Sequence, residues 1–375
     1  MIYLDNAATT LQKPSVVYKT YFDAVRRCSA NAGRGGHRYA LRASEMVFEA
    51  AESVAMLLGI AQPERIAFTQ NATMALNMAI HGVCKPGGHN VITQTEHNSV
   101  LRPVAYSGCA YTVAKADENG YVSPRAVRQA MRENTQLVIV NHISNVCGQV
   151  QPIEAIARVA HDFGALLLVD AAQSAGVAHI EAVRQGIDLL AFAGHKGLMG
   201  PLGTGGLYVA PQVSITPLMQ GGSGSESENP LQPSAMPDLL VSGTVNAPAI
   251  AALGSAARYV YSLGKGALLA HERRLAKAFC DRVYEMKGVR VYCGNGDGSG
   301  VVSINIENKN PVEVGNALER DYGIAVRSGL HCAPLMHQAL LTYPAGTVRF
   351  SFGHFNTMRD AKKAADAVYK CIKSV

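Results

Sequence analysis

Continuous apolar runs alternate with helix-like segments through the first half of the chain, and this alternation limits the folds that the sequence can adopt. Three of the runs are Leu137–Val140, Leu166–Val169 and Leu189–Ala193, and polar residues follow each of them. Strands that are apolar at every position are typical of parallel sheets, because helices cover both faces of such a sheet. The pattern therefore predicts an α/β fold with a mostly parallel central sheet.

Further segments complete a predicted series of seven strands with helices between them. The additional strands are Arg65–Thr69, Asn90–Thr93, Tyr111–Ala114 and Gly205–Val209, and the helices include Met74–Gly82, Ser123–Arg132 and Pro152–Phe163. Polar residues gather just after the strands, at their carboxyl ends. Open α/β sheets bind their ligands at that edge.

The C-terminal part of the chain changes pattern and predicts a smaller α+β domain. Helices are expected at Asn246–Leu263 and Ala267–Met286, followed by short strands and helices, with Ile324–Arg327 expected as one strand. We therefore expect a large domain of residues 15–258 and a small domain of residues 1–14 and 259–375. Residues 211–242 are rich in Gly, Ser and Pro and are predicted to form a long loop. Whether residues 221–238 act as a mobile lid is left open.

Composition excludes several classes of protein. Hydrophobic residues make up 48% of the chain and charged residues 17%, which is typical of a globular protein. The net charge of +6 comes without runs of Lys or Arg, so we expect no binding to nucleic acid. We recognise no signal peptide and no membrane span. The eight cysteines show neither Cys-x-x-Cys nor zinc spacing, so we expect reduced thiols in a cytoplasmic protein without a metal site.

Lys196 directly follows one of the apolar runs, in the segment Gly194–Gly197. Burial at the end of a strand disfavours the charged ammonium and so lowers the pKa of a lysine amine. The neutral amine that results can form a Schiff base. A lysine that keeps its amine in water explains the motif equally well. The residues at the other strand ends must therefore distinguish the two interpretations.

Four other polar residues at strand ends precede Lys196. Asp170 ends an apolar strand, where a carboxylate is costly unless a cation such as a protonated pyridine nitrogen pairs with it. Gln173 could bond a phenolic oxygen, and His97 could stack on an aromatic ring. Thr73 begins a helix, where backbone N–H groups and the helix dipole favour phosphate. Asp170 and Thr73 could instead be simple helix caps and His97 a core histidine, but their coincidence favours one shared site.

Two motifs extend this interpretation to a known family. The segment Ala193–Gly197, together with Asp170–Gln173, resembles the pyridoxal-phosphate site of class V aminotransferases, which have the fold-type I architecture. The segment Arg327–Ala333 resembles the catalytic-cysteine segment of group II cysteine desulfurases, a branch that includes selenocysteine lyases. The opening segment Tyr3–Thr10 also fits. The resemblance covers essentially the whole chain and implies pyridoxal 5'-phosphate as cofactor and a homodimer.

The resemblance also implies a role for each matching residue. Lys196 would hold the cofactor through a Schiff base and move a proton, Cys332 would be the nucleophile that receives sulfur, and His97 would also be catalytic. The implied cofactor-binding residues are Asp170 at the ring nitrogen, Gln173 and Asn145 at the ring oxygen, His97 on the ring face, Ala72, Thr73 and His195 at the phosphate, and Thr244 reaching the phosphate in a partner subunit. The implied substrate-binding residues are Arg349 on the substrate carboxylate, with Asn145, Arg327 and His331.

Attack on a substrate sulfur requires a thiolate, and we expect His331 and Arg327 to supply positive charge beside Cys332. The alternative is that Cys332 is a buried structural thiol like the other cysteines. The sequence departs from the family pattern at Ala193, where relatives often carry a phosphate-binding serine, and at Leu330, where a second histidine is common. These departures bear on substrate preference and leave the implied cofactor unchanged.

The implied reaction converts L-cysteine to L-alanine and leaves the sulfur as a persulfide on Cys332. A protein acceptor would then take the sulfur, as in iron–sulfur cluster assembly. Three alternatives stay open from the sequence. The protein could act on selenocysteine or cysteine sulfinate, it could catalyse another class V aminotransferase or lyase reaction, or it could be a non-catalytic sulfur carrier that keeps the fold.

Overall fold

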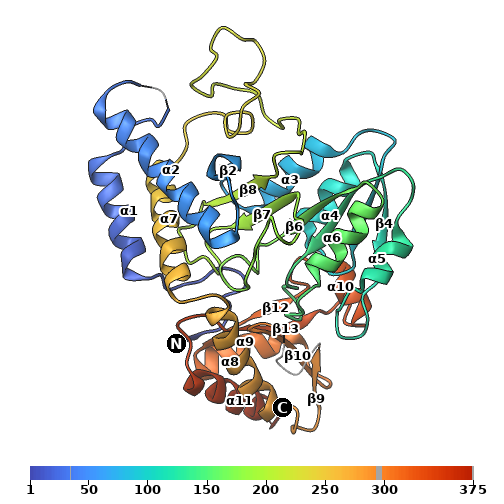
Figure 1. Cartoon of the computed structure of the whole chain (residues 1–375). Coiled ribbons are helices and arrows are strands. Elements are labelled where there is room, and N and C mark those ends of the chain that lie inside the picture. The colour runs from blue at the N-terminus through green and yellow to red at the C-terminus, as the bar shows by residue number, and fades with distance from the viewer. Residues whose placement is uncertain (34, 293–297, 374–375) are drawn as a thin grey trace.

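The computed structural model describes residues 1–33, 35–292 and 298–373, and a seven-stranded sheet forms the centre of its larger part (Figure 1). The strands are β2 (Ile66–Thr69), β3 (His89–Thr93), β4 (Ala110–Ala114), β5 (Thr135–Asn141), β6 (Leu166–Asp170), β7 (Leu189–Ala193) and β8 (Gly205–Val209). Their order is β2-β8-β7-β6-β5-β3-β4. All pairings from β7 to β4 are parallel, and only β8 runs antiparallel to its neighbours β7 and β2. The predicted mostly parallel α/β fold is confirmed.

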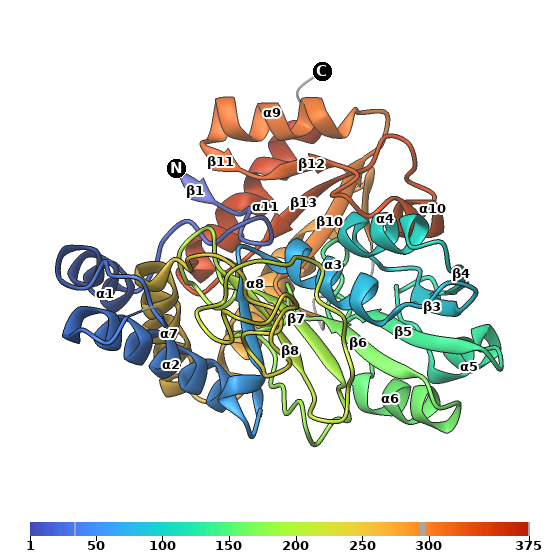
Figure 2. The same ribbon diagram turned by 90° about the horizontal axis from the view of Figure 1, so that it is seen from above.

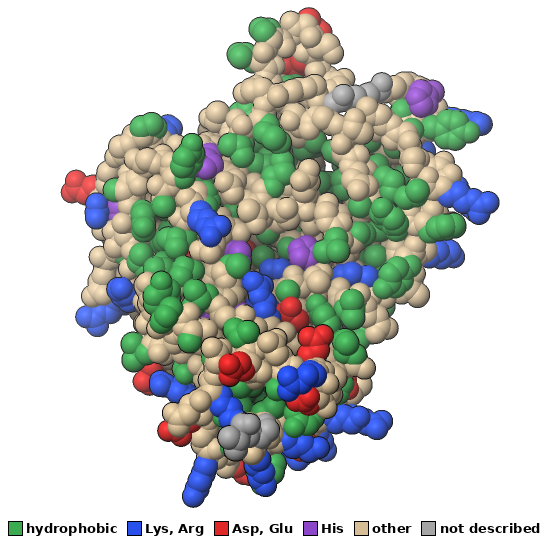
Figure 3. All heavy atoms as spheres, turned by 180° about the vertical axis from the view of Figure 1, so that it is seen from behind, with side chains coloured by type: hydrophobic (Ala, Val, Ile, Leu, Met, Phe, Trp, Pro, Cys, Tyr) green, Lys and Arg blue, Asp and Glu red, His purple; other side chains and the backbone are tan. Residues whose placement is uncertain are grey.

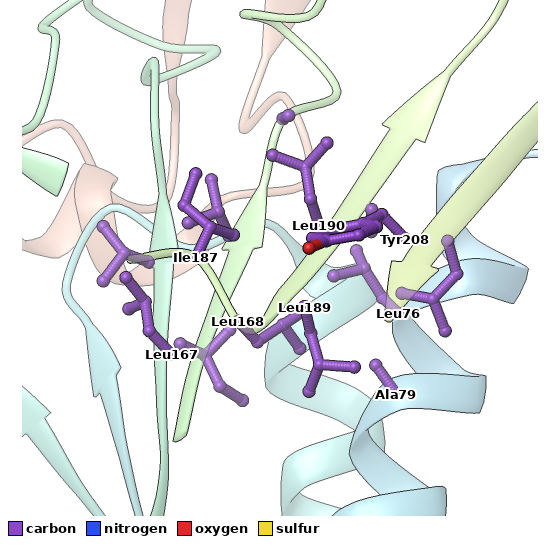
Figure 4. Close-up of a cluster of buried hydrophobic side chains, with 14 of the residues drawn as sticks. Leu76, Ala79, Leu167, Leu168, Ile187, Leu189, Leu190 and Tyr208 are labelled. Atoms are coloured by element: carbon purple, nitrogen blue, oxygen red, sulfur yellow. The ribbon is translucent and has the colours of Figure 1, made fainter. Parts of the chain in front are cut away.

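Helices cover both faces of this sheet, with α3 and α4 on one side and α5 and α6 on the other (Figure 2). Their bounds are α3 (Ala72–Val83), α4 (Asn98–Tyr106), α5 (Pro124–Ala130) and α6 (Ile153–Asp162). Figure 4 shows part of the resulting core, in which Leu189 of β7 lies toward Leu76 and Ala79 of α3. Burial on both faces explains why these strands are apolar at almost every position.

A four-stranded antiparallel sheet organises the smaller part, in the order β12-β13-β10-β9. The elements are β9 (Val289–Tyr292), β10 (Val301–Ile306), β12 (Arg327–Gly329) and β13 (Thr347–Ser351), with α8 (Ala267–Val283), α9 (Pro311–Tyr322), α10 (Pro334–Ala339) and α11 (Met358–Lys373). The predicted single strand Ile324–Arg327 is wrong. It divides into β11 (Ile324–Ala325), which pairs in parallel with β1 (Ile2–Tyr3), and β12, which pairs with β13.

Each sheet has its own cluster of buried side chains, in keeping with the expected division into two domains. The expected boundary at residue 258 falls inside α7 (Ala247–Ser262), which packs against α1 (Ser15–Arg27) and α2 (Arg38–Leu58). The exact domain limits therefore stay a prediction. Residues 210–246 contain neither helix nor strand, as expected for a long loop, and part of this segment protrudes at the top of Figure 1.

The described surface carries charges of both signs. On the face in Figure 3, Lys and Arg side chains lie among Asp and Glu side chains over the smaller part of the molecule. No described helix is long and apolar enough to cross a membrane. Within the described ranges, no three His, Cys, Asp or Glu side chains are grouped as metal ligands would be. Seven cysteines are described and none forms a disulfide, while Cys293 lies outside the described residues.

The close packing of α7 on α2 gives a stability prediction. A Cβ atom at Gly254 would lie 2.6 Å from the Cα atom of Ala50, so the helices would have to separate. We expect Gly254→Ala to lower the free energy of unfolding by about 1–3 kcal/mol, despite the better helix propensity of alanine. Urea denaturation measures this difference. Gly36→Ala, where a Cβ meets no heavy atom within 4 Å, should change stability by less than about 1 kcal/mol. Equal stabilities of the two variants would contradict the packing.

Candidate active site

Lys196 is a partly buried residue that follows β7, and charged groups from both sheets act on its amine. Burial lowers the pKa of Lys196 to about 8, against the opposing effect of the Asp170 carboxylate. Arg349 and Arg327 lower this pKa further, and Cys332 raises it. The structure thus brings five residues that the sequence singled out into one site.

Asp170 is the last residue of β6 and is 2% exposed. One carboxylate oxygen accepts a hydrogen bond from the backbone N–H of Ala172 at 2.9 Å, so the residue does cap the turn that follows. Burial raises the pKa of Asp170, and this N–H and Lys196 oppose the rise. Gln173 lies on the same turn and donates its side-chain N–H to the backbone oxygen of Ala7 at 2.9 Å.

His97 caps the N-terminus of α4, and its ring is neutral. The backbone N–H of Ser99 donates to Nδ1 at 3.0 Å, which places the ring proton on Nε2. Burial lowers the pKa of His97 to about 4, and the nearby Lys196 contributes. The hydroxyl of Ser99 lies 2.9 Å from Nδ1 and 2.8 Å from the hydroxyl of Thr73, so a hydrogen-bonded chain joins His97 to the start of α3.

The N-terminus of α3 has the properties of an anion site. Asn71 caps the helix by accepting from the N–H of Met74 at 2.9 Å, whereas the N–H groups of Ala72 and Thr73 make no hydrogen bond within the described part of the chain. Ala72 packs with Ala172 and Ala193, which places this helix start beside the ends of β6 and β7. Free N–H groups at a helix start favour a phosphate.

A pocket of about 620 Å³ opens beside this helix start and is lined by Asn71, His195 and Thr244. His195 Nδ1 lies 3.1 Å from the hydroxyl of Thr9, and burial lowers its pKa to about 4. Thr244 is exposed and lines the pocket of its own chain. Its expected reach into a partner subunit is not tested by a single chain and stays a prediction.

Cys332 lies in a strained turn between β12 and α10. His331 and Cys332 have φ angles of 48° and 60°, in the left-handed region that non-glycine residues rarely adopt. Two hydrogen bonds from the larger part support the turn: Asn98 N–H donates to the Cys332 carbonyl oxygen, and Asn145 Nδ2 to the His331 carbonyl oxygen, both at 2.7 Å. Arg327 Nη2 lies 3.5 Å from the sulfur of Cys332.

The structure does not support the expected positive charge on His331, whereas its expected substrate contact stays a prediction. Its side chain is 1% exposed, lies 3.1 Å from the hydroxyl of Thr347 through Nε2 and packs against the ring of His337. Burial lowers the pKa of His331 to about 2, with Arg349 contributing, so the ring is neutral. A neutral ring supplies no positive charge to Cys332.

Arg349 lies on β13, 1% exposed, and makes a contact that the sequence did not indicate. Its Nη2 donates to the Asp5 carboxylate at 2.6 Å, and its Nη1 donates to the backbone oxygen of Asn145 at 3.1 Å. Asp5 was only part of a matching segment in the sequence. Because 344 positions separate the partners, only the folded arrangement could reveal the pair.

Glu96 is a second residue that sequence reasoning missed. Its side chain is fully buried, and its Oε1 accepts from the Thr93 hydroxyl at 2.5 Å and from the Asn141 N–H at 2.8 Å. Oε2 is buried and has no hydrogen-bond partner among the described residues. Burial raises the pKa of Glu96 to about 8, and Asp170 adds to this rise. Its position after an apolar strand and directly before His97 was the available signal.

A lysine with a lowered pKa and a buried carboxylate thus lie at the carboxyl edge of a mostly parallel sheet. The family model of aminotransferase class V matches residues 2–363, and the chain belongs to this family. The family depends in general on pyridoxal phosphate.

Similar proteins agree with this assignment. A probable cysteine desulfurase of Methanothermobacter thermautotrophicus is 37% identical, over 96% of this chain and 92% of the relative. A probable cysteine desulfurase of Halalkalibacterium halodurans is 35% identical, over 99% of this chain and 93% of the relative. The apo structure of a cysteine desulfurase from Thermococcus onnurineus NA1 is 31% identical and superposes with a TM-score of 0.92, covering 100% of this chain and 95% of that one.

The burial of Glu96 predicts a change in the pH dependence of stability. Its folded-state pKa of about 8 exceeds the ordinary value of 4.5, so the folded protein keeps a proton that the unfolded chain releases. This stabilisation is complete below pH 4.5 and is lost as the pH rises to about 8. We expect the free energy of unfolding of Glu96→Gln to fall by a few kcal/mol less than that of the wild type over this pH range, since one pKa unit is worth about 1.4 kcal/mol. Urea denaturation at a series of pH values measures both profiles.

A matched variant tests the interpretation. Glu272 of α8 is also buried, with a pKa raised to about 8, so Glu272→Gln should flatten the pH profile in the same direction. If the profile of Glu96→Gln runs parallel to that of the wild type while Glu272→Gln flattens it, Glu96 is ionised in the folded protein.

Proposed function

We propose that this protein is a pyridoxal-phosphate-dependent cysteine desulfurase, which converts L-cysteine to L-alanine and keeps the sulfur as a persulfide on Cys332. The observation that carries the proposal is that a thiol from the smaller part, Cys332, lies within electrostatic reach of the Lys196 amine. An amine can take the proton from the α-carbon of an amino acid, and a thiolate can attack its sulfur. The names of the curated relatives support the same activity.

The residues present fit the cofactor. The N–H groups of Ala72 and Thr73, unbonded at the start of α3, would bind its phosphate with His195 beside them. The buried carboxylate of Asp170 would hold the proton on its ring nitrogen. Lys196 would hold it through a Schiff base, His97 would face the ring, and Gln173 and Asn145 would lie at the ring oxygen. When bound, the cofactor withdraws electrons from the α-carbon of the substrate.

Lys196 and Arg349 act on the substrate in different ways. A lysine pKa of about 8 leaves a useful fraction of the amine neutral near pH 7, so Nζ can accept the α-proton. Arg349 is the proposed carboxylate-binding residue, since a guanidinium offers parallel N–H groups to a carboxylate. Together they would bind the amino acid by its carboxylate and place its α-hydrogen toward the amine.

Sulfur transfer needs no external oxidant. The Cys332 thiolate attacks the sulfur of the bound cysteine, so the carbon–sulfur bond breaks as a sulfur–sulfur bond forms. The electron pair of the broken bond stays with the carbon part, which takes up a proton and leaves as alanine. The Arg327 guanidinium lies 3.5 Å from this sulfur and would donate a hydrogen bond to it during the attack.

We also infer a homodimer and a protein acceptor for the persulfide sulfur. Thr244 is exposed on the rim of the pocket that His195 lines, and this position would allow it to reach the phosphate site of a second copy. Cys332 is only partly buried, so an acceptor thiol could approach it.

Removal of the thiol tests the proposed function. We expect Cys332→Ala to lose at least about a hundredfold in alanine and sulfide formation from L-cysteine, because the thiol that attacks the substrate sulfur is removed. The absorbance of bound pyridoxal phosphate should be retained, because Cys332 is not one of the residues proposed to bind it. Assays with cysteine sulfinate and selenocysteine measure the substrate preference.

Cys28→Ala is the matched control, since Cys28 lies on a different pocket between α1 and α2. This variant should keep the wild-type rate. Normal desulfuration by Cys332→Ala would show that Cys332 is not the nucleophile. Absence of cofactor absorbance in the wild-type protein would favour a non-catalytic sulfur carrier.

A further inference from the structure

The N-terminal strap, which we define as residues 3–10, runs between the two parts of the molecule and contacts the active site at both ends. At one end the hydroxyl of Thr10 donates to the backbone oxygen of Lys196 at 2.8 Å, and the hydroxyl of Thr9 lies beside His195. In its middle the backbone oxygen of Ala7 accepts from Gln173. At the other end Asp5 binds Arg349. These contacts join the strap directly to residues of the active site.

The backbone of the strap fixes Asp5 against β13. Asp5 pairs with Ser351 in a short parallel bridge. The N–H of Ser351 donates to the Leu4 oxygen at 2.7 Å, and the N–H of Ala7 donates to the Ser351 hydroxyl at 2.9 Å. Ser351 and Arg349 are two positions apart on one strand, so their side chains share a face. The Asp5 carboxylate is thus held beside the Arg349 guanidinium by the register of the backbone.

Asp5 also offsets a repulsion between two arginines. Arg327 and Arg349 are direct partners in the antiparallel pairing of β12 with β13, and the Arg327 guanidinium disfavours the charge of Arg349. Burial and, to a smaller extent, Arg327 lower the pKa of Arg349, whereas Asp5 raises it. The Asp5 side chain is 21% exposed and that of Arg349 1% exposed, so the pair is only weakly screened by water.

The remaining hydrogen-bonding groups of Arg349 determine what else it can bind. Nη2 is used once by Asp5 and Nη1 once by the Asn145 oxygen, and each terminal nitrogen carries two hydrogens. One N–H on each terminal nitrogen is therefore left after these two contacts. A carboxylate needs such a pair in a fixed plane.

We propose that Asp5 is a positioning residue, whose carboxylate fixes the plane of the Arg349 guanidinium so that it can bind the carboxylate of an amino acid. The inference rests on the proposed function in one respect, that the amino acid is the substrate. It assigns Asp5 a part in ligand recognition and not only in folding. Without Asp5, the Arg349 guanidinium would turn away from Arg327 and would no longer be held in the plane that a carboxylate needs. Arg327 would still supply positive charge.

The test compares two ligands that differ by one carboxylate. L-Alanine and ethylamine are titrated into the cofactor-loaded wild type and Asp5→Asn, with binding followed by calorimetry. We expect the dissociation constant of L-alanine to rise about tenfold in Asp5→Asn, because an amide bonds the guanidinium more weakly than a carboxylate. The dissociation constant of ethylamine should stay within about twofold. Asp5→Ala should weaken L-alanine binding further.

Two controls separate positioning from folding. Asn6→Ala removes the strap's side-chain bond to the Ser351 oxygen at 2.8 Å but does not touch Arg349. It should lower the thermal midpoint of the cofactor-free protein and leave L-alanine binding unchanged. Arg349→Lys should weaken L-alanine binding and leave ethylamine binding unchanged.

Three outcomes would overturn the inference. These are unchanged or tighter L-alanine binding in Asp5→Asn, an equal loss for both ligands, and an equal loss of L-alanine binding in Asn6→Ala. If the wild type bound L-alanine no better than ethylamine, the proposed carboxylate-binding site would be contradicted. If cysteine is not desulfurated but Asp5→Asn still selectively weakens L-alanine, the proposed function fails and the role of Asp5 stands.

Discussion

The cost of burying charge between two sheets is the constraint on which the site depends. Lys196, Arg327 and Arg349 bring three cationic side chains together, and each would be unfavourable there without an anion or the loss of a proton. Lysine can lose its proton, whereas arginine stays charged and needs a partner. Asp170 from the large sheet and Asp5 from the strap supply the anions. The charges that compensate one another therefore come from both sheets and from the strap.

Contact between the two sheets also makes the reactive turn possible. Two consecutive residues with left-handed backbone, His331 and Cys332, are unfavourable unless their surroundings hold them. Asn98 and Asn145 provide that support from the strand ends of the large sheet, by binding the carbonyl oxygens of the turn. The edge of the sheet that would receive the cofactor therefore also sets the position of the sulfur nucleophile. Movement of one sheet against the other would change both together.

The sequence predicted those features that local pattern determines. Strands such as β6 and β7 are apolar throughout, and the polar residues after them could be expected to meet at one edge, as Asp170 and Lys196 do. The direction of a side chain in an irregular turn, in contrast, is not determined by the local sequence pattern. A motif identifies His331 beside Cys332, but whether its ring faces the substrate or the core depends on φ angles and on Thr347, which pairs with it only in the fold. The Asp5–Arg349 contact depends in the same way on pairing between distant segments.

Burial also determines which groups can respond to pH near neutrality. The pKa values of His97 and His195 are lowered to about 4 and that of His331 to about 2, so the imidazoles of the site are already neutral. Lys196, Glu96 and Lys13, whose amine donates to the backbone oxygen of His195, have values near 8. Deprotonation of Lys196 creates the base, whereas deprotonation of Glu96 would add a second buried anion near Asp170, which is one reason why the pKa of Glu96 is raised. Rising pH therefore makes the Lys196 amine a better base but also adds a buried negative charge at Glu96. The histidines His97 and His195 are already neutral in this pH range and do not change.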